Sequence, residues 1–466
     1  MRSVFLIATL DTKGREADFV RGLLTSWGVP VTLVDVGALG TPAVTADVTR
    51  DRIFALAETS IEVVRQKGDR GDAVTKAAAG AARLAREAHA RGELSGVLGL
   101  GGSAGTTIAT AAMRELPIGV PKVMVSTLAS GTVRQFVGDT DIFMLNSVVD
   151  ILGINRVSRE VLAEAARAMA GLVTYPRPEP RADDKPLVAA TMFGVTTACV
   201  ERARETLERA GCEVLVFHAT GNGGQAMESL IAGGLIAGVL DVTTTELADE
   251  HVGGFLSAGP ARLTAAGQAG IPQVVSTGAL DMVNFYAPES VPPQFKDRLF
   301  YRHNAVVTLM RTTPEENAAI GAAMAMKLSA AKGPVAVLLP ARGISAIDKE
   351  GQPFDDAAAR KALHNAIRSG MHERLRLASE ASRAAASGGV APPAVKSACG
   401  PREGPEGSVA ERRPRARASG GGAPRAMRIE VIELDLHIND PAFADAAANK
   451  LLELMKHVEM TRVKEG

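Results

Sequence analysis

Short, continuous apolar runs alternate with amphipathic, alanine-rich segments along most of this 466-residue chain. Residues 4–10 and 187–192 are typical runs, and residues 197–210 are a typical amphipathic segment. A run that is apolar at every position is expected to be a strand covered on both faces, as in a parallel sheet. Strands that alternate with helices of about a dozen residues predict βαβ units. The fold class that we predict is α/β, with doubly wound parallel sheets.

Changes in composition divide the chain into domains and connections. Residues 175–186 hold four prolines among mixed charges and predict a linker. This linker separates a first Rossmann-like domain, 1–174, from a second one, 187–378. Residues 379–426 are rich in Ala, Gly, Pro, Ser and Arg, so we expect a disordered insert that cannot bury enough apolar surface to fold. Residues 427–466 predict a strand and a capped helix that pack on the second domain.

The totals argue against several classes of protein. Lys plus Arg equals Asp plus Glu at 52 each, so net charge gives no argument for binding nucleic acid or a membrane surface. Cys199, Cys212 and Cys399 have no paired spacing, which argues against a disulfide framework and against a zinc knuckle. The apolar runs are too short for membrane spans, and no small-residue cleavage site follows the first one. We therefore expect a cytoplasmic protein.

Glycines and hydroxyl side chains gather at three predicted strand-to-helix junctions of the first domain. Ligands of doubly wound sheets bind beyond the carboxyl ends of the strands, and the amides of a helix N-terminus suit phosphate or carboxylate. The alternative is that the glycines only allow a helix to pack closely on a strand. Thirteen residues are the candidate anion-binding set: Asp11, Thr12, Lys13, Gly101, Gly102, Ser103, Gly105, Thr106, Thr107, Ser126, Thr127, Ser130 and Gly131.

The second domain supplies candidates for acid–base chemistry. His218, just after an apolar run, is the best single candidate, although a lone histidine is often structural. We expect Asp241, Glu246, Arg302 and His303 to gather near it. The two carboxylates could hold Mg²⁺ with waters, although their spacing does not require a metal. Arg302 or, alternatively, Arg311 would hold an anion.

Several strings occur together and in order: ATLDTKGRE, GLGGSAGT, MVSTLASG, VFHATGNGGQAMESL, LDVTTTEL and HINDPAFADA. As a set they resemble the Tm-one-like ATP-binding family, an uncharacterised group that includes bacterial relatives of the N-terminal region of the tomato mosaic virus resistance protein. The resemblance runs from about Ser3 to the mid-370s and resumes near Glu430. It implies two Rossmann-like domains, a homodimer, and a nucleotide site in the first domain.

Three hypotheses of function follow. The first is an ATP-dependent enzyme that holds ATP, with or without Mg²⁺, in the first domain and a small anionic metabolite in the second. Its general base would be His218. The second is a regulatory or interaction protein for which ATP is a structural or allosteric ligand. The third is that the glycine-rich loops only pack.

Overall fold

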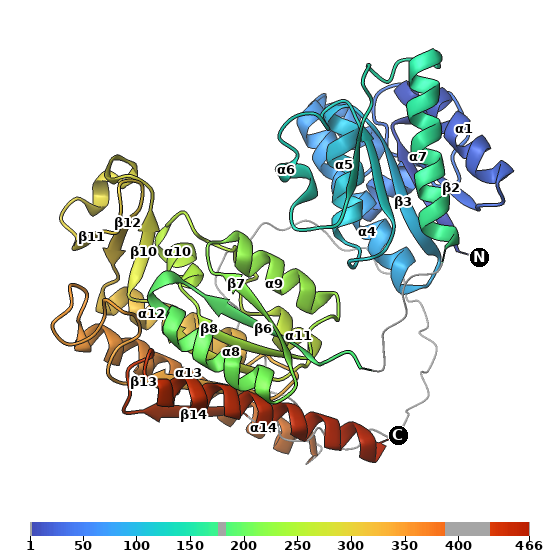
Figure 1. Ribbon diagram of the computed structural model, residues 1–466. Helices are drawn as coiled ribbons and strands as arrows, with labels where there is room; N and C mark the ends of the chain where they lie inside the picture. The colour runs from blue at the N-terminus through green and yellow to red at the C-terminus, as the bar shows by residue number, and fades with distance from the viewer. Residues whose placement is uncertain (1, 176–182, 387–428, 466) are drawn as a thin grey trace. The chain divides into compact units, whose positions relative to one another are not determined.

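The computed structural model describes residues 2–175, 183–386 and 429–465. Contacts between Cα atoms divide the chain into two compact units, Met1–Asp184 and Lys185–Gly466 (Figure 1). The division falls within the segment predicted as a linker, of which residues 176–182 lie outside the described residues. Most of the predicted insert also lies outside them. The helix that precedes it continues to Ala386, beyond the predicted domain end at 378.

The first unit is built on a five-stranded sheet in the order β2-β1-β3-β4-β5, with all neighbours parallel. Its strands are β1 (Ser3–Ala8), β2 (Val31–Asp35), β3 (Leu94–Gly101), β4 (Lys122–Ser126) and β5 (Phe143–Asn146). Its helices are α1 (Leu10–Ser26), α2 (Arg50–Leu56), α3 (Ile61–Lys67), α4 (Arg70–Ala90), α5 (Ser103–Arg114), α6 (Arg134–Val137) and α7 (Arg156–Thr174).

Helices cover both faces of this sheet, which is why its central strands are apolar throughout. Every residue of β1 is buried. One hydrophobic core joins that strand to α4 and α5, and another joins it to α1 and α7. The strand order changes direction between β1 and β3, so the connections that leave these two strands diverge there. A crevice at the carboxyl ends of such a strand pair is the usual ligand position in doubly wound folds.

The second unit holds a six-stranded parallel sheet in the order β14-β13-β9-β8-β6-β7. Its strands are β6 (Leu187–Met192), β7 (Glu213–His218), β8 (Gly238–Thr243), β9 (Gln273–Gly278), β13 (Val335–Pro340) and β14 (Ile429–Leu434). Its helices are α8 (Thr197–Arg209), α9 (Asn222–Ala232), α10 (Glu246–Val252), α11 (Ala265–Ala269), α12 (Pro314–Leu328), α13 (Ala357–Ala386) and α14 (Pro441–Glu465). The predicted α/β class with two Rossmann-like units is confirmed.

A small antiparallel sheet in the second unit departs from the prediction. It has the order β10-β12-β11, with β10 (Met282–Phe285), β11 (Phe300–Arg302) and β12 (Thr308–Arg311). The apolar run at residues 306–310 predicts a further strand of the doubly wound sheet, and the structure places this strand in the small sheet instead. The apolar run indicates a buried strand, but nothing in it specifies which strands will be its neighbours.

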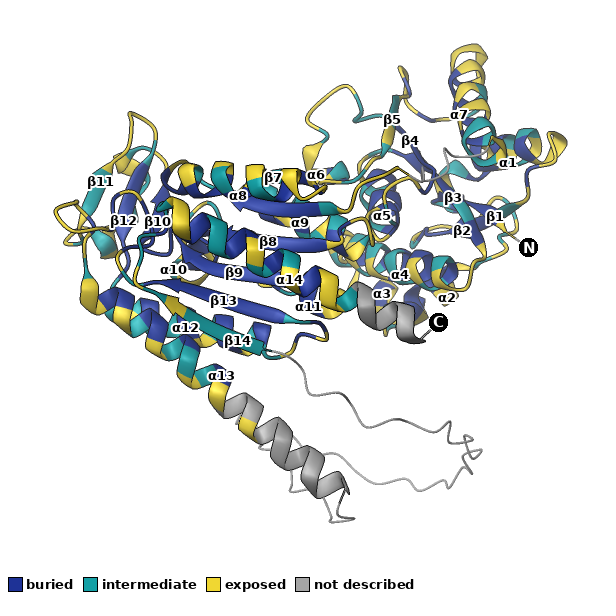
Figure 2. Cartoon of the chain, turned by 60° about the horizontal axis from the view of Figure 1, so that its bottom comes forward, coloured by how far each residue is buried: buried dark blue, intermediate teal, exposed yellow. Residues whose placement is uncertain are grey.

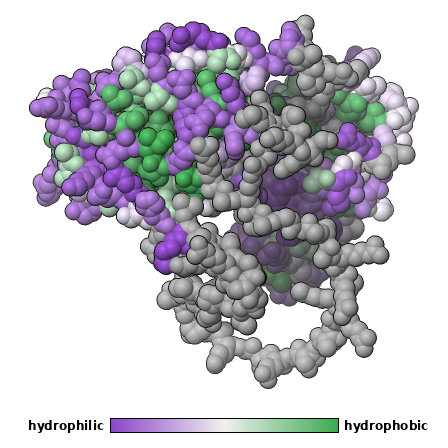
Figure 3. Space-filling view, turned by 90° about the horizontal axis from the view of Figure 1, so that it is seen from below, coloured by the Kyte–Doolittle hydropathy of each residue, from purple (hydrophilic) through white to green (hydrophobic). Residues whose placement is uncertain are grey.

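The C-terminal segment belongs to the second unit, although residues 387–428 separate it in sequence. Strand β14 pairs in parallel with β13 at the edge of the sheet. Helix α14 packs beside α8, and Phe443, Leu451 and Leu454 on it are fully buried (Figure 2). The viewed face in Figure 3 is largely hydrophilic over the second unit, with apolar side chains gathered in one area, which is ordinary for a globular protein.

Two sequence expectations concern cysteines and membranes. Cys199 and Cys212 are buried, and no disulfide joins them within the described residues, while Cys399 lies outside these residues. Among the helices that the structure describes, none has the length and hydropathy needed to cross a membrane.

Candidate functional site

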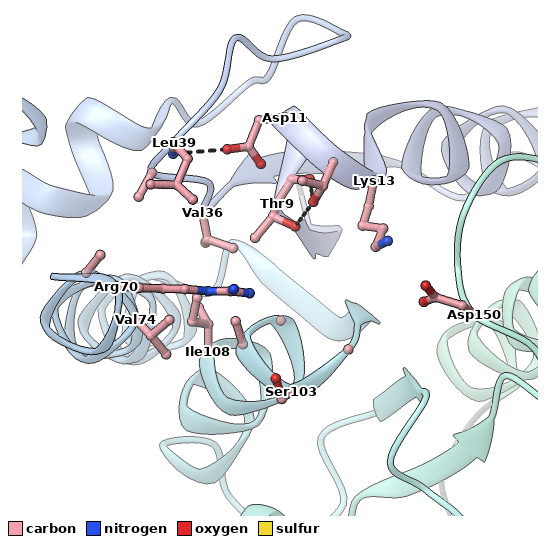
Figure 4. A pocket seen from close by; sticks show the side chains of 16 residues that line it. Thr9, Asp11, Lys13, Val36, Leu39, Arg70, Val74, Ser103, Ile108 and Asp150 are labelled. Carbon is pink, nitrogen blue, oxygen red and sulfur yellow. Dashed lines mark hydrogen bonds between the residues drawn. The ribbon is translucent and has the colours of Figure 1, made fainter. Parts of the chain in front are cut away.

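A cavity of about 290 Å³ opens at the carboxyl ends of β1 and β3 in the first unit, where the strand order changes direction (Figure 4). The start of α1 and the start of α5 form two sides of it, α4 and the connection after β2 form two others, and the segment after β5 contributes one residue. It is lined by Thr9, Asp11, Thr12, Lys13, Val36, Ala38, Leu39, Arg70, Ala73, Val74, Gly102, Ser103, Ala104, Gly105, Ile108 and Asp150. Six of the thirteen predicted anion-binding residues are among these.

One end of the cavity is electropositive. Helix α5 begins there at Ser103, and no side chain of the described residues caps its N-terminus. The first amides of a helix lack partners within it and carry a partial positive charge. The side chains of Lys13 and Arg70 extend into the same space (Figure 4). This end of the cavity therefore has the donors and charges that an anion requires.

Lys13 reaches the cavity because α1 is kinked at this residue. Its backbone has φ −126° and ψ 18°, outside the helical range. The amides of Thr12 and Lys13 both donate to the carbonyl of Thr9, and the hydroxyls of Thr9 and Thr12 lie 2.7 Å apart. The segment before the kink is therefore a separate turn that presents Lys13 at the end of β1.

Asp11 has a positioning role that differs from the anion contact we predicted. Its Oδ2 accepts hydrogen bonds from the amides of Leu39 and Gly40, at 3.1 and 2.9 Å. Arg50 holds the same connection by donating to the carbonyl of Gly40 while its Nε donates to Asp35. Ala38 and Leu39 of this connection form part of the apolar wall of the cavity. Val36, Val74 and Ile108 also belong to this wall.

The packing explanation of the glycines holds for some of them and fails for one. A Cβ on Gly101 would lie 2.6 Å from the Cα of Gly105, and one on Gly105 would lie 3.0 Å from the carbonyl oxygen of Leu100. These glycines let α5 pack against β3. A Cβ on Gly102 would meet only the hydroxyl of Thr127, at 3.4 Å. Packing therefore does not explain Gly102, which lines the cavity.

A pair of alanine substitutions tests this division. We expect Gly101→Ala to lower the free energy of unfolding by ~1–3 kcal/mol, because the methyl group overlaps backbone atoms of α5. We expect Gly102→Ala to change it by less than about 0.5 kcal/mol. Urea unfolding measures both. Equal destabilisation by the two substitutions would show that Gly102 is also needed for packing.

The third predicted loop does not line the cavity. The hydroxyls of Thr106 and Ser126 are buried and lie 2.7 Å apart, so they join α5 to β4. Thr107 donates its hydroxyl to the carbonyl of Ser103. The remaining predicted residues that do not line the cavity are Gly101, Thr127, Ser130 and Gly131. The hydroxyls of Thr106, Thr107 and Ser126, which we predicted to bind a ligand, thus form hydrogen bonds within the protein instead.

In the second unit, Asp241 and Glu246 are brought together by a residue that the sequence analysis missed. Arg262 is fully buried, and its guanidinium donates to both carboxylate oxygens of Asp241 at 2.5 and 2.7 Å. Its Nε donates to Glu246 at 2.7 Å. The guanidinium therefore lies between the two carboxylates, at the position that we considered for Mg²⁺. Among the described residues, no group of three or more His, Cys, Asp and Glu side chains is arranged to hold a metal.

The side chain of Glu246 also binds the N-terminus of a neighbouring helix, α9. Its Oε1 accepts hydrogen bonds from the amides of Gly221 and Gly224 at the start of α9, at 2.7 and 3.1 Å. Burial raises the pKa of this carboxyl, although Arg262 acts in the opposite direction. The N-terminus of α9 therefore binds a carboxylate of the protein itself, whereas that of α5 opens into a cavity.

The other predicted catalytic residues do not join this group. His218 ends β7 and is exposed, with its ring 5.5 Å from that of Phe193. Arg302 and His303 are exposed at the end of β11, in the antiparallel sheet. Within the described residues, none of the three forms a side-chain hydrogen bond with Asp241. Arg311 is buried and donates to the carbonyl of Phe354 at 2.8 Å, so it is engaged in the fold.

Comparison with known proteins gives consistent matches over both units. Models of the N-terminal and C-terminal domains of the uncharacterised protein family UPF0261 match residues 2–178 and 185–385. A UPF0261 protein of Clostridium tetani is 50% identical over 367 residues, which cover 79% of this chain and 91% of that protein.

Two further relatives extend the comparison. The UPF0261 protein RA0729 of Rhizobium meliloti is 48% identical over 79% of this chain and 90% of its own length. The ToMV resistance protein Tm-1(GCR237) of Solanum lycopersicum is 42% identical over 77% of this chain and 50% of its own length. The predicted resemblance is confirmed, and the chain belongs to the uncharacterised protein family UPF0261.

Proposed function

We propose that the first unit binds ATP in the cavity between β1 and β3. The observation that carries the proposal is that the N-terminus of α5, which no described side chain caps, opens into the same cavity as Lys13 and Arg70. A helix N-terminus is worth about half a positive charge, and the two side chains add two full charges. Together they match the negative charge of a polyphosphate.

The apolar part of the cavity suits the base. Val36, Leu39, Val74 and Ile108 line the cavity, and Figure 4 shows Val74 and Ile108 beside the side chain of Arg70. Ligand sites commonly combine an apolar wall with a few polar groups that fix orientation. An adenine would lie against this wall while the phosphates reach α5.

The activity that we propose is that of an ATP-dependent enzyme acting on a small anionic metabolite, with ATP entering as its Mg²⁺ complex. His218, Arg302 and His303 keep exposed side chains that could contact this metabolite. The alternative is a regulatory or interaction protein with ATP as a structural or allosteric ligand. The two differ in turnover: only the enzyme consumes ATP when the purified protein is given a pooled metabolite extract.

Calorimetry with variants of Lys13 tests the site. We expect Lys13→Ala to weaken ATP binding by ~10–100-fold, because hydrogen bonds to charged groups contribute about 1.5–3 kcal/mol. The control is Lys332→Ala, which changes an exposed lysine of the second unit and should leave the affinity unchanged. ATP at 100 times its dissociation constant should stabilise the wild-type protein by ~2.7 kcal/mol. Absence of both heat and thermal stabilisation in the wild type would contradict the proposal.

A homodimer and a cytoplasmic location complete the proposal. The family resemblance supports the first, and the composition supports the second. Light scattering of the eluting protein should give twice the mass of the 48.5 kDa chain. A monomer at micromolar concentration would contradict the homodimer without affecting the ATP site.

A further inference from the structure

The cavity of the first unit also holds a carboxylate that is absent from the predicted site residues. Asp150 lines the cavity, and its carboxylate and the ammonium of Lys13 point toward each other (Figure 4). Within the described residues, neither forms a side-chain hydrogen bond or an ion pair. A positively charged and a negatively charged side chain therefore face the same cavity without pairing with each other. This arrangement indicates a ligand that carries both negative and positive charge.

The segment that carries Asp150 is fixed on both sides. The hydroxyl of Ser147 donates to the carbonyl of Val149 at 2.6 Å, and Ile151 is buried in the core beside α1 and α7. The amide of Gly153 donates to the buried carboxylate of Glu16 on α1. Asp150 is therefore held in place between two anchored positions while its own side chain stays in the cavity.

The second carboxylate of the cavity is not available in the same way. Asp11 uses its Oδ2 to hold the amides of Leu39 and Gly40. The side chain of Asp11 is only 5% exposed, whereas Asp150 is exposed and, within the described residues, neither of its carboxylate oxygens accepts a hydrogen bond. Beside a polyphosphate it would be repelled, because two anions would face each other at short range. A divalent cation between them removes this repulsion.

We propose that Asp150 is the protein ligand, directly or through a bound water, of the Mg²⁺ that enters with ATP. This inference rests on the proposed ATP site. Mg²⁺ in nucleotide sites is typically held by one or two carboxylates together with phosphate oxygens and waters, and one carboxylate is what this cavity supplies. Lys13 and the N-terminus of α5 would then contact phosphate oxygens that the metal leaves free.

The test compares ATP binding with excess Mg²⁺ and with EDTA in the wild type and in Asp150→Asn. We expect Mg²⁺ to tighten binding to the wild type by ~10-fold or more, and to change binding to the variant by less than about threefold. In EDTA the variant should bind ATP at least as tightly as the wild type, because the repelling charge is gone. Glu160→Gln, an exposed carboxylate change on α7, is the control and should keep the wild-type response to Mg²⁺.

Other outcomes overturn the inference in distinguishable ways. If Asp150→Asn weakens binding equally with Mg²⁺ and with EDTA, Asp150 accepts a hydrogen bond from the nucleotide and holds no metal. If the variant keeps the full gain from Mg²⁺, Asp150 has no part in binding it. If the wild type binds ATP in neither condition, the ATP site itself is wrong and this inference fails with it. Thermal unfolding should be the same for all three proteins, since the side chains of Asp150 and Glu160 are exposed.

Discussion

Replacing Arg262 by methionine is expected to destabilise the second unit by about 3–5 kcal/mol, as is usual when a buried ion pair loses one partner. The guanidinium of Arg262 is completely buried and contacts the buried carboxylates of Asp241 and Glu246. Methionine fills similar space but leaves both buried carboxyl groups without their cationic partner. Urea unfolding at pH 7, followed by far-UV circular dichroism, measures the loss.

Lowering the pH should reduce this loss. Burial already raises the pKa of Glu246, and removal of the guanidinium takes away the group that lowers it. A carboxyl whose pKa is higher in the folded state than in the unfolded state favours folding when protonated, and this contribution is lost as pH rises. The difference between Arg262→Met and the wild type should therefore be smaller at pH 5 than at pH 7.

An exposed ion pair provides the matched control. Arg204 pairs with Glu208 one helical turn away, at 2.6 Å, and both side chains are largely exposed. Arg204→Met should cost less than about 1 kcal/mol at either pH. If Arg262→Met were as stable as this control, the carboxylates of Asp241 and Glu246 would not depend on Arg262, and both would remain candidates for acid–base chemistry.

Replacing Ser103 by glutamate is expected to abolish ATP binding without weakening the fold. Ser103 is the first residue of α5 and is exposed at the cavity. An acidic side chain near a helix N-terminus stabilises the helix by about 0.3–1 kcal/mol. Two like charges about 4 Å apart repel by ~4 kcal/mol near a protein surface, so ATP should bind at least ~100-fold more weakly.

The control for this substitution is Ser103→Gln, which has nearly the same size as glutamate and no charge. It should lose much less affinity than Ser103→Glu. Calorimetry gives the affinities, and thermal unfolding without ligand shows whether the fold is kept. Equal affinities for the two variants would mean that no phosphate group lies near the start of α5.

Continuous apolar runs made the strands of the main sheets predictable. The sequence predicts strands over residues 122–126, 187–192 and 213–218, and β4, β6 and β7 have these bounds. Arg262 could not be found in this way, because it lies in an irregular segment between α10 and α11. Its partners Glu246 and Asp241 precede it by 16 and 21 residues, and no periodic pattern in the sequence connects them with Arg262.

The part of the candidate site that directly follows the ends of strands was predictable, because the order of the strands alone places those residues. The carboxyl ends of β1 and β3 are adjacent in the sheet, so Lys13 and Ser103 were expected near each other. Arg70 was missed because the alanine-rich pattern predicts a helix over residues 73–91 only. The side chain of Asp69 accepts hydrogen bonds from the amides of Gly71 and Asp72, and α4 therefore starts at Arg70. An aspartate before an alanine-rich segment is the signal that could have placed it.

The most direct test of the ATP site is a crystal structure of the protein grown with ATP and Mg²⁺. We expect phosphate oxygens within hydrogen-bonding distance of the amides of Ser103, Ala104 and Gly105, with the ammonium of Lys13 beside them and adenine against Val74 and Ile108. A nucleotide bound elsewhere on the chain, with side chains or solvent alone at the start of α5, would contradict the account.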